Sequence, residues 1–231
     1  MTKTEIKNLL STLTKLISPA LEVVGLLINN KVEYTFTSRN LDFMLNSVGN
    51  YGDYITIEPY FVLHNEMSEN FISNNIQRIS HVGLFNAGHK LANFLNIQDF
   101  NSTEFNNFDF SNFTYKYTVY NINDIMKCSI DIMKYMQTVG MKLVEISNDD
   151  KKLYEFYYNM ILSKQEAISK PNFKPSDLIM TFGLEVIYCS IFLGVKNKLE
   201  SKEELEKMIK EMYASNEIVI NNIDKLSRIL K

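Results

Sequence analysis

The spacing of apolar residues changes near residue 121, and this change constrains the fold more than any other feature of the chain. Before it, short runs such as 32–37 and 114–120 alternate apolar and polar residues, as strands with one buried face do. After it, apolar residues recur every three or four positions, as in amphipathic helices. The sequence therefore predicts a predominantly helical α+β protein, with a mixed region at 1–120 and an all-helical region at 121–231. The two regions form either separate domains or one continuous domain.

The mixed region is expected to contain a small sheet of about three strands. Strands are expected at 32–37, 54–64 and 114–120, which are rich in β-branched and aromatic residues. Pro59 is expected to mark an edge, a bend or a bulge, because proline cannot donate to a strand ladder. Ser18 and Pro19 favour the start of a helix. Four helical segments are accordingly expected, at 4–17, 19–28, 39–48 and 66–97.

The helical region contains several residues that favour helix N-termini. Asn123 is expected to cap the first helix, 148–150 the second and Ser176 the third. Ser201, with Glu204 three residues later, matches a capping box. The last helix is expected to bury residues at helical spacing near 218–230. The buried stripe expected on the first helix comprises Ile125, Ser129, Ile132, Met136, Val139, Leu143 and Ile146.

The charge pattern argues against general nucleic-acid binding. The net charge is −3, and the lysines are interleaved with acidic residues. Nucleic-acid binders usually carry a clustered basic face, because neutralising phosphates supplies much of their affinity. Arginine, which grips phosphate and reads guanine, occurs only at Arg39, Arg78 and Arg228. We therefore expect no general nucleic-acid partner.

The cysteines and the apolar segments indicate a cytoplasmic protein. Of the 231 residues, 45% are hydrophobic, which is enough for a core without disulfides. Cys128 and Cys189 lie in apolar helical surroundings and are expected to be buried free thiols. The most apolar stretch, 178–195, contains Glu185 and is expected to be a core helix rather than a membrane span. The opening residues do not resemble a secretory signal.

Sequence motifs for common chemistries are absent. The chain contains no GxxxxGK[ST], GxGxxG, GxSxG or HExxH pattern, which would indicate phosphate binding, nucleophilic hydrolysis or zinc proteolysis. It also contains no CxxC pair for zinc or redox chemistry. We therefore expect a non-enzymatic protein with no catalytic residues, no metal and no cofactor.

Two alternative functions depend on the three histidines, which all fall within 64–89. His81 and His89, with Arg78 and His64, could line a binding site in a small-molecule or haem-binding sensor, since one imidazole suffices to ligate haem iron. Alternatively, His64, Glu66, Arg78 and His81 could serve as acid and base in a hydrolase or nuclease. Both alternatives require these side chains to converge.

The leading hypothesis is an interaction protein, which acts as a regulator, inhibitor, adaptor or assembly subunit. Its expected partner is another protein or a second copy of the chain. Two surfaces are candidates. One comprises Phe105, Phe108 and Phe110 in the Asn-rich loop 98–113, and the other is the tyrosine cluster, Tyr154, Tyr157 and Tyr158. Tyrosine is a frequent interface anchor. The methionines at helical spacing, among them Met126 and Met141, are interpreted as core residues.

Overall fold

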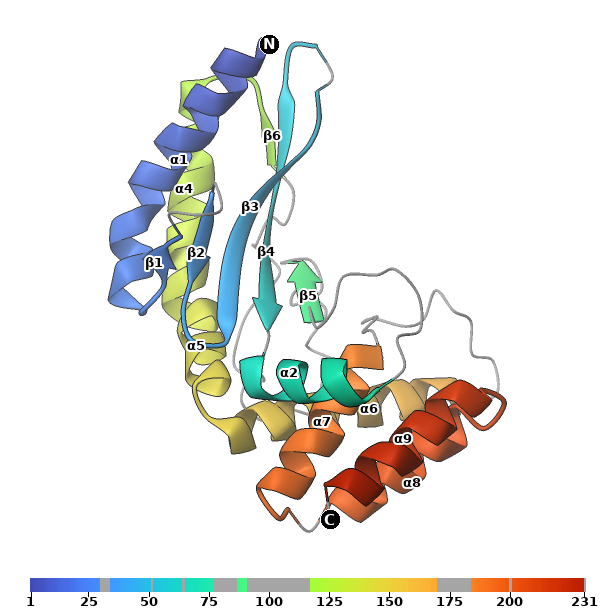
Figure 1. The fold of residues 1–231 in the computed structure, drawn as a ribbon. Coiled ribbons are helices and arrows are strands. Elements are labelled where there is room, and N and C mark those ends of the chain that lie inside the picture. Colours follow the sequence, from blue (N-terminus) through green and yellow to red (C-terminus); the bar gives the residue numbers. More distant parts are fainter. Residues whose placement is uncertain are drawn as a thin grey trace. The chain divides into compact units, whose positions relative to one another are not determined.

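The computed structural model describes residues 1–29, 34–50, 52–63, 65–76, 87–90, 117–169, 184–199 and 201–230. They form a mixed structure with an antiparallel sheet in the first half of the chain and a helical second half (Figure 1). The chain divides into two compact units. Among the described residues, unit 1 holds those within 1–63, 88–90 and 117–147, and unit 2 holds 65–76, Ala87 and those within 148–230. The division expected at residue 121 falls within unit 1.

Helix α1 spans Lys3–Val23 and is continuous. The prediction of two helices that meet at Ser18 and Pro19 is therefore wrong. Pro19 lies inside α1 on its exposed side, so water can bond the carbonyl that the missing N–H leaves without a donor. The hydroxyl of Ser18 donates to the Thr14 carbonyl (2.7 Å) instead of capping a new helix.

Gly25 ends α1 in a Schellman motif. The N–H of Gly25 donates to the Glu22 carbonyl (3.0 Å), and the N–H of Leu26 donates to the Leu21 carbonyl (2.9 Å). Gly25 has φ +85°, a conformation that glycine adopts without steric cost. The chain then enters strand β1 (Leu27–Ile28), where the sequence predicted helix.

Among the described residues, the sheet has six strands rather than the predicted three. Its order is β1-β2-β3-β4-β5, and β6 also pairs with β4. The prediction of strands is confirmed at 55–63, 117–119 and 35–37. The remaining strands were missed because β1 and β5 are short and β3 was taken for a helix. The bounds are β2 Thr35–Thr37, β3 Leu41–Asn50, β4 Ile55–Leu63, β5 Ala87–Lys90 and β6 Tyr117–Val119.

Strand β3 lies where the sequence predicted a short helix at 39–48. Its apolar residues fit both a helical and an alternating pattern. The alternating set Leu41, Phe43 and Leu45 is buried, and the Phe43 ring packs on Phe61 of β4 with centroids 5.1 Å apart. Pairing with strands on both sides therefore selects the extended conformation.

Strand β4 continues through Pro59, which pairs with Leu45 without a change of register. The irregularity in this ladder lies between Val48 and Asn50 instead, and β4 has neighbours on both sides. The N–H of Leu45 donates to the Tyr34 carbonyl on the β2 side (3.0 Å). Leu45 and Pro59 therefore form a non-hydrogen-bonded pair. The N–H that Pro59 lacks would not have donated to β3.

Helix α2 is shorter than predicted and spans Glu66–Asn75. Asn65, rather than Ser68, is its N-cap, because the Asn65 side chain accepts the Ser68 N–H (3.0 Å). Residues 87–90, which the sequence assigned to the same helix, form β5. The remainder of the predicted helix, 77–86 and 91–97, lies outside the described residues.

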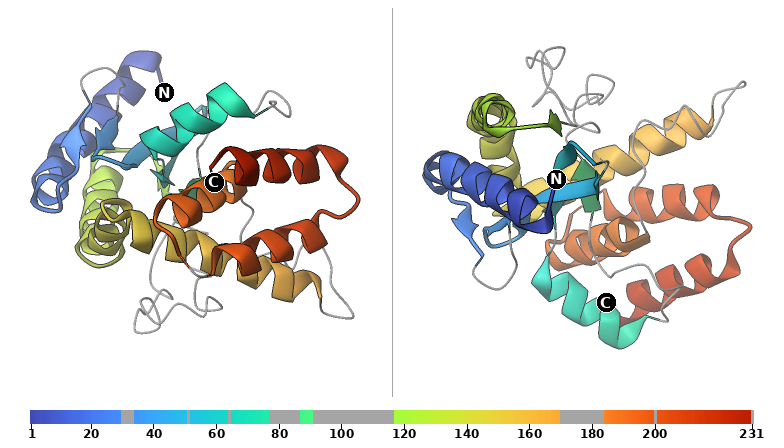
Figure 2. Two further views of the ribbon diagram at one scale, coloured as in Figure 1. Left: turned by 60° about the horizontal axis from the view of Figure 1, so that its bottom comes forward. Right: turned by 90° about the horizontal axis from the view of Figure 1, so that it is seen from above.

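Three consecutive helical segments complete unit 1: α4 (Ile122–Tyr135), the π-helix η2 (Met136–Gly140) and α5 (Met141–Ser147). Asn121, not Asn123, is the N-cap of α4, and its side chain accepts the Asn123 N–H (2.8 Å). Helix α4 packs against α1, and Figure 2 shows the two side by side. The predicted stripe is confirmed as buried at Ile125, Ser129, Ile132, Met136, Leu143 and Ile146.

Unit 2 is built around α7 (Leu184–Lys196). This helix packs against α2, α6 (Asp150–Ile168), α8 (Lys202–Met212) and α9 (Glu217–Ile229). Residues 186–193 are all buried, so α7 is the core helix that the sequence predicted. None of the described helices is long and apolar enough to cross a membrane.

Ser201 does not form the predicted capping box. It is the N-cap residue of α8, but its backbone is helical and its side chain makes no cap hydrogen bond. Its hydroxyl pairs with the Tyr154 hydroxyl at 2.9 Å. A tertiary hydrogen bond therefore competes successfully with the local cap.

We expect Gly25→Ala to lower the free energy of unfolding by about 1 kcal/mol, because alanine is strained at positive φ. The nearest side-chain atom to an added Cβ, Cγ1 of Val144, would be 4.0 Å away, so the cost is conformational and not steric. Gly25→Asn should recover most of the loss, since asparagine tolerates this conformation. Urea denaturation measures both; equal losses in the two variants would contradict the assignment.

Candidate functional site

The predicted ligand-binding residues lie almost entirely outside the described residues. His64, Arg78 and His81 are among those outside. His89 lies on β5, where the backbone alone is described. The predicted ligand-binding site therefore stays a prediction.

The predicted interaction residues divide into two groups. Phe105, Phe108 and Phe110 lie outside the described residues. The tyrosines lie on α6, where Tyr154 and Tyr157 are 2% exposed and Tyr158 is half-buried. Burial raises the pKa of the Tyr157 hydroxyl well above its ordinary value. These rings mainly fill the core of unit 2, and only Tyr158 offers part of its surface to solvent.

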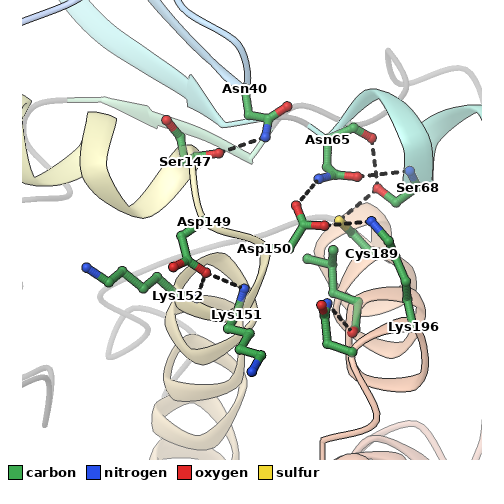
Figure 3. Close-up of polar contacts among 12 residues, drawn as sticks. Asn40, Asn65, Ser68, Ser147, Asp149, Asp150, Lys151, Lys152, Cys189 and Lys196 are labelled. Atoms are coloured by element: carbon green, nitrogen blue, oxygen red, sulfur yellow. Dashed lines mark hydrogen bonds and ion pairs between the residues drawn. The ribbon is translucent and has the colours of Figure 1, made fainter.

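A polar network in unit 2 is centred on Asp150, the first residue of α6 (Figure 3). One carboxylate oxygen accepts a hydrogen bond from the Asn65 side chain (3.2 Å), and the other pairs with the Lys196 ammonium (2.6 Å). Asp149 accepts the N–H groups of Lys151 and Lys152 (2.8 and 3.2 Å). Acidic groups at a helix N-terminus stabilise the helix. The contacts of Asp150 also join the starts of α2 and α6 to the end of α7.

Cys189 lies beside this network on α7 and is buried. Its sulfur is 3.0 Å from the Ser68 hydroxyl, which also donates to the Asn65 carbonyl (2.9 Å). Burial raises the pKa of the Cys189 thiol to about 12, although the hydrogen bond between Cys189 and Ser68 opposes the shift. A nucleophilic cysteine needs a lowered pKa and access to solvent, and this thiol has neither.

A second thiol, Cys128, occupies the core of unit 1 on α4 and is also buried. Burial raises its pKa, and the nearby Asp131 carboxylate adds to the shift. The Tyr117 hydroxyl donates to Asp131 (3.4 Å), and burial likewise raises the pKa of Tyr117. The prediction of two buried free cysteines is confirmed, and both behave as core residues.

The remaining described polar groups also serve packing. Asn40, just before β3, donates from its side chain to the Ser147 carbonyl at the end of α5 (2.7 Å, Figure 3). In the described part of the chain, no three His, Cys, Asp or Glu side chains are placed to hold a metal ion.

An open groove of about 700 Å³ lies along α8 and α9 of unit 2. Carboxylates and cations are interleaved in its lining, and Lys210 pairs with Asp224 at 2.6 Å. Two carboxylates and three cations line the groove, so it presents charges of both signs to any ligand. Its charged lining residues are Glu206, Lys210, Asp224, Lys225 and Arg228.

The exposed side of α4 carries an apolar row, Ile122, Met126 and Ile130, which we call the α4 row. Their side chains are 47%, 45% and 60% exposed. Residues four apart lie on one face of a helix, and this face lies about 100° around the helix axis from the buried stripe that contains Ile125 and Ser129. Exposed apolar residues that gather on one face mark candidate sites of interaction. The α4 row is therefore the candidate functional surface.

The sequence analysis missed the α4 row because it interpreted Met126 as a core residue. Helix α4 carries two apolar stripes, and the spacing of either one alone predicts a buried face. The sequence did contain a signal, because α4 has more apolar residues than one buried stripe needs. Ile122, Met126 and Ile130 follow helical spacing about 100° from the stripe through Ile125 and Ser129. One helix in a small unit seldom buries so wide an arc.

Comparisons with protein-family models, with curated proteins and with solved structures find no match to this chain. The α4 row and the contacts described above are therefore the basis for a functional assignment.

We expect neither cysteine to react with a soluble disulfide reagent at pH 8 while the protein is folded, and both to react in denaturant. The free energy of unfolding should fall as the pH rises above about 9, because the unfolded chain then loses thiol protons that the folded chain retains until about pH 12. Urea denaturation at a series of pH values measures this slope.

The matched control replaces both cysteines with alanine. Its slope should be shallower between about pH 9 and 10, before the tyrosines of the unfolded chain ionise. Rapid modification of the folded protein, or an unchanged slope in the control, would contradict the prediction.

Proposed function

We propose that the chain is a non-enzymatic interaction protein that acts through contacts with another protein or with a second copy of itself. The α4 row carries this proposal. Burying the half of each isoleucine or methionine that is still exposed contributes roughly 1 kcal/mol, and a few residues at the centre of an interface supply most of its binding energy. The proposed role is that of a regulator, inhibitor, adaptor or assembly subunit.

The state of the polar groups supports contact rather than catalysis. A reaction centre needs accessible groups with pKa values matched to their task. The two thiols are buried and their pKa values are raised, and Asp150 is engaged by Asn65 and Lys196. We also place the protein in the cytoplasm, since unpaired buried cysteines are typical of reducing compartments. A general nucleic-acid partner is not part of the proposal.

We expect Met126→Glu and Ile130→Glu to abolish specific association while leaving the fold intact. A carboxylate at the centre of an apolar interface loses its hydration without gaining a partner, whereas at an exposed position it changes the free energy of unfolding by no more than about 0.5 kcal/mol. Size-exclusion chromatography with light scattering detects self-association, and affinity capture from a native lysate with mass spectrometry detects partners.

Ile218→Glu is the matched control, because Ile218 is a similarly exposed isoleucine (48%) on α9. It should retain whatever association the native protein shows. If the native protein is a monomer and captures the same proteins as the two α4 variants, the proposal fails.

A further inference from the structure

The described methionines differ widely in their exposure to solvent. Met126, at the centre of the α4 row, is 45% exposed, and Met67 on α2 and Met141 on α5 are 51% and 53% exposed. Met136, the first residue of η2, follows α4 directly and is fully buried. Peroxides oxidise the thioether of methionine to a sulfoxide, and an oxidant dissolved in water reaches exposed thioethers first.

Met126 is the oxidisable residue of the α4 row. Ile122 and Ile130 lie about one turn before and one turn after it on the same face of α4, and their hydrocarbon side chains do not react with peroxide. Met133 lies seven residues further along this side of the helix and is half-buried. Oxidation at Met126 therefore changes the centre of the exposed apolar surface and leaves its two ends as they are.

The two thiols do not compete for the oxidant while the protein is folded. Cys128 and Cys189 are 1% and 5% exposed, and burial raises the pKa of both thiols. Peroxides react with the thiolate rather than with the thiol, so these cysteines are protected both by burial and by protonation. Among the described sulfur atoms, those of the exposed methionines are the ones that a peroxide reaches.

We propose that Met126 is a site of reversible oxidation and that its oxidation switches off the α4 row as an interaction surface, an inference that rests on the proposed function. The oxidant is a peroxide. The Met126 sulfur loses two electrons and forms a bond to one peroxide oxygen, the O–O bond breaks, and with hydrogen peroxide the second oxygen leaves as water. A methionine sulfoxide reductase reverses the step: two thiols supply two electrons and become a disulfide, and the sulfoxide oxygen leaves as water.

The sulfoxide changes what the α4 row offers to a partner. An apolar thioether becomes a polar group that accepts hydrogen bonds from water. While the row is exposed, this group keeps its hydration, so the stability of the fold should change little. When a partner covers the row, the sulfoxide loses that water between Ile122 and Ile130, whose side chains donate no hydrogen bond. Oxidation therefore weakens association without unfolding the protein.

The first measurement follows oxidation at each methionine separately. The full chain is treated with hydrogen peroxide, and peptide mass spectrometry detects the added oxygen atom as a function of time. We expect Met126 to oxidise at least about tenfold faster than the buried Met136. The same treatment in denaturant is the control, because the two rates should then be nearly equal. Equal rates in the folded chain would overturn the assignment of Met126.

The second measurement connects oxidation to association, by light scattering and by capture from a native lysate before and after peroxide. Treatment of the native chain should weaken association at least about tenfold, and methionine sulfoxide reductase with dithiothreitol should restore it. Met126→Leu keeps an apolar side chain of similar volume and has no sulfur, so its association should not respond to peroxide. Met133→Leu is the matched control and should remain sensitive. Urea denaturation verifies that each oxidised chain is folded.

The outcomes separate this inference from the proposed function. If Met126→Glu abolishes association but peroxide does not weaken it, the α4 row is an interaction surface and the switch is wrong. Equal sensitivity of Met126→Leu and the native chain would also overturn the switch, because another methionine would then be responsible. A loss that the reductase does not restore would contradict reversibility. If Met126→Glu leaves association unchanged, the proposed function fails and the switch fails with it.

Discussion

Phe43, Phe61 and Tyr135 connect the sheet of unit 1 to α4, with ring centroids 5.1 Å apart between the first pair and 6.1 Å apart between the second. All three side chains are buried. Together with the packing of α4 against α1, this aromatic contact holds one side of α4 in the core of unit 1. Ile122, Met126 and Ile130 lie off that side, and the proposed function depends on their exposure.

A network of polar groups has a comparable structural role in unit 2. Asp150 links Asn65 and Lys196, and Ser68 contacts Cys189. These contacts secure the ends of α2 and α6 against α7, whose own side chains are almost entirely apolar. Hydrogen bonding to buried or half-buried groups fixes their positions, because leaving such a group without a partner costs more than the bond contributes.

Sequence periodicity predicted the helical second half and the buried stripe of α4 well, because long amphipathic patterns admit one interpretation. It failed where two patterns coincide or where tertiary contacts outweigh local preference. Residues 41–50 satisfy both periods, and pairing with β4 decides between them. Pro19 is tolerated inside α1 because it faces water, and Ser201 bonds Tyr154 rather than its own helix. The α4 row was missed for a similar reason. Met126 is exposed and Met136 is buried, but both follow the helical spacing of apolar residues in the sequence.

Strand β1 forms one edge of the sheet and is very short. It contains two residues, Leu27 and Ile28, and it covers the backbone edge of β2. So short a strand offers too few N–H and C=O groups to recruit a foreign chain by backbone pairing, which is one way in which natural sheets avoid aggregation. Association along the β1 margin is thereby left to side chains, whose sequence can discriminate between partners as a bare backbone cannot.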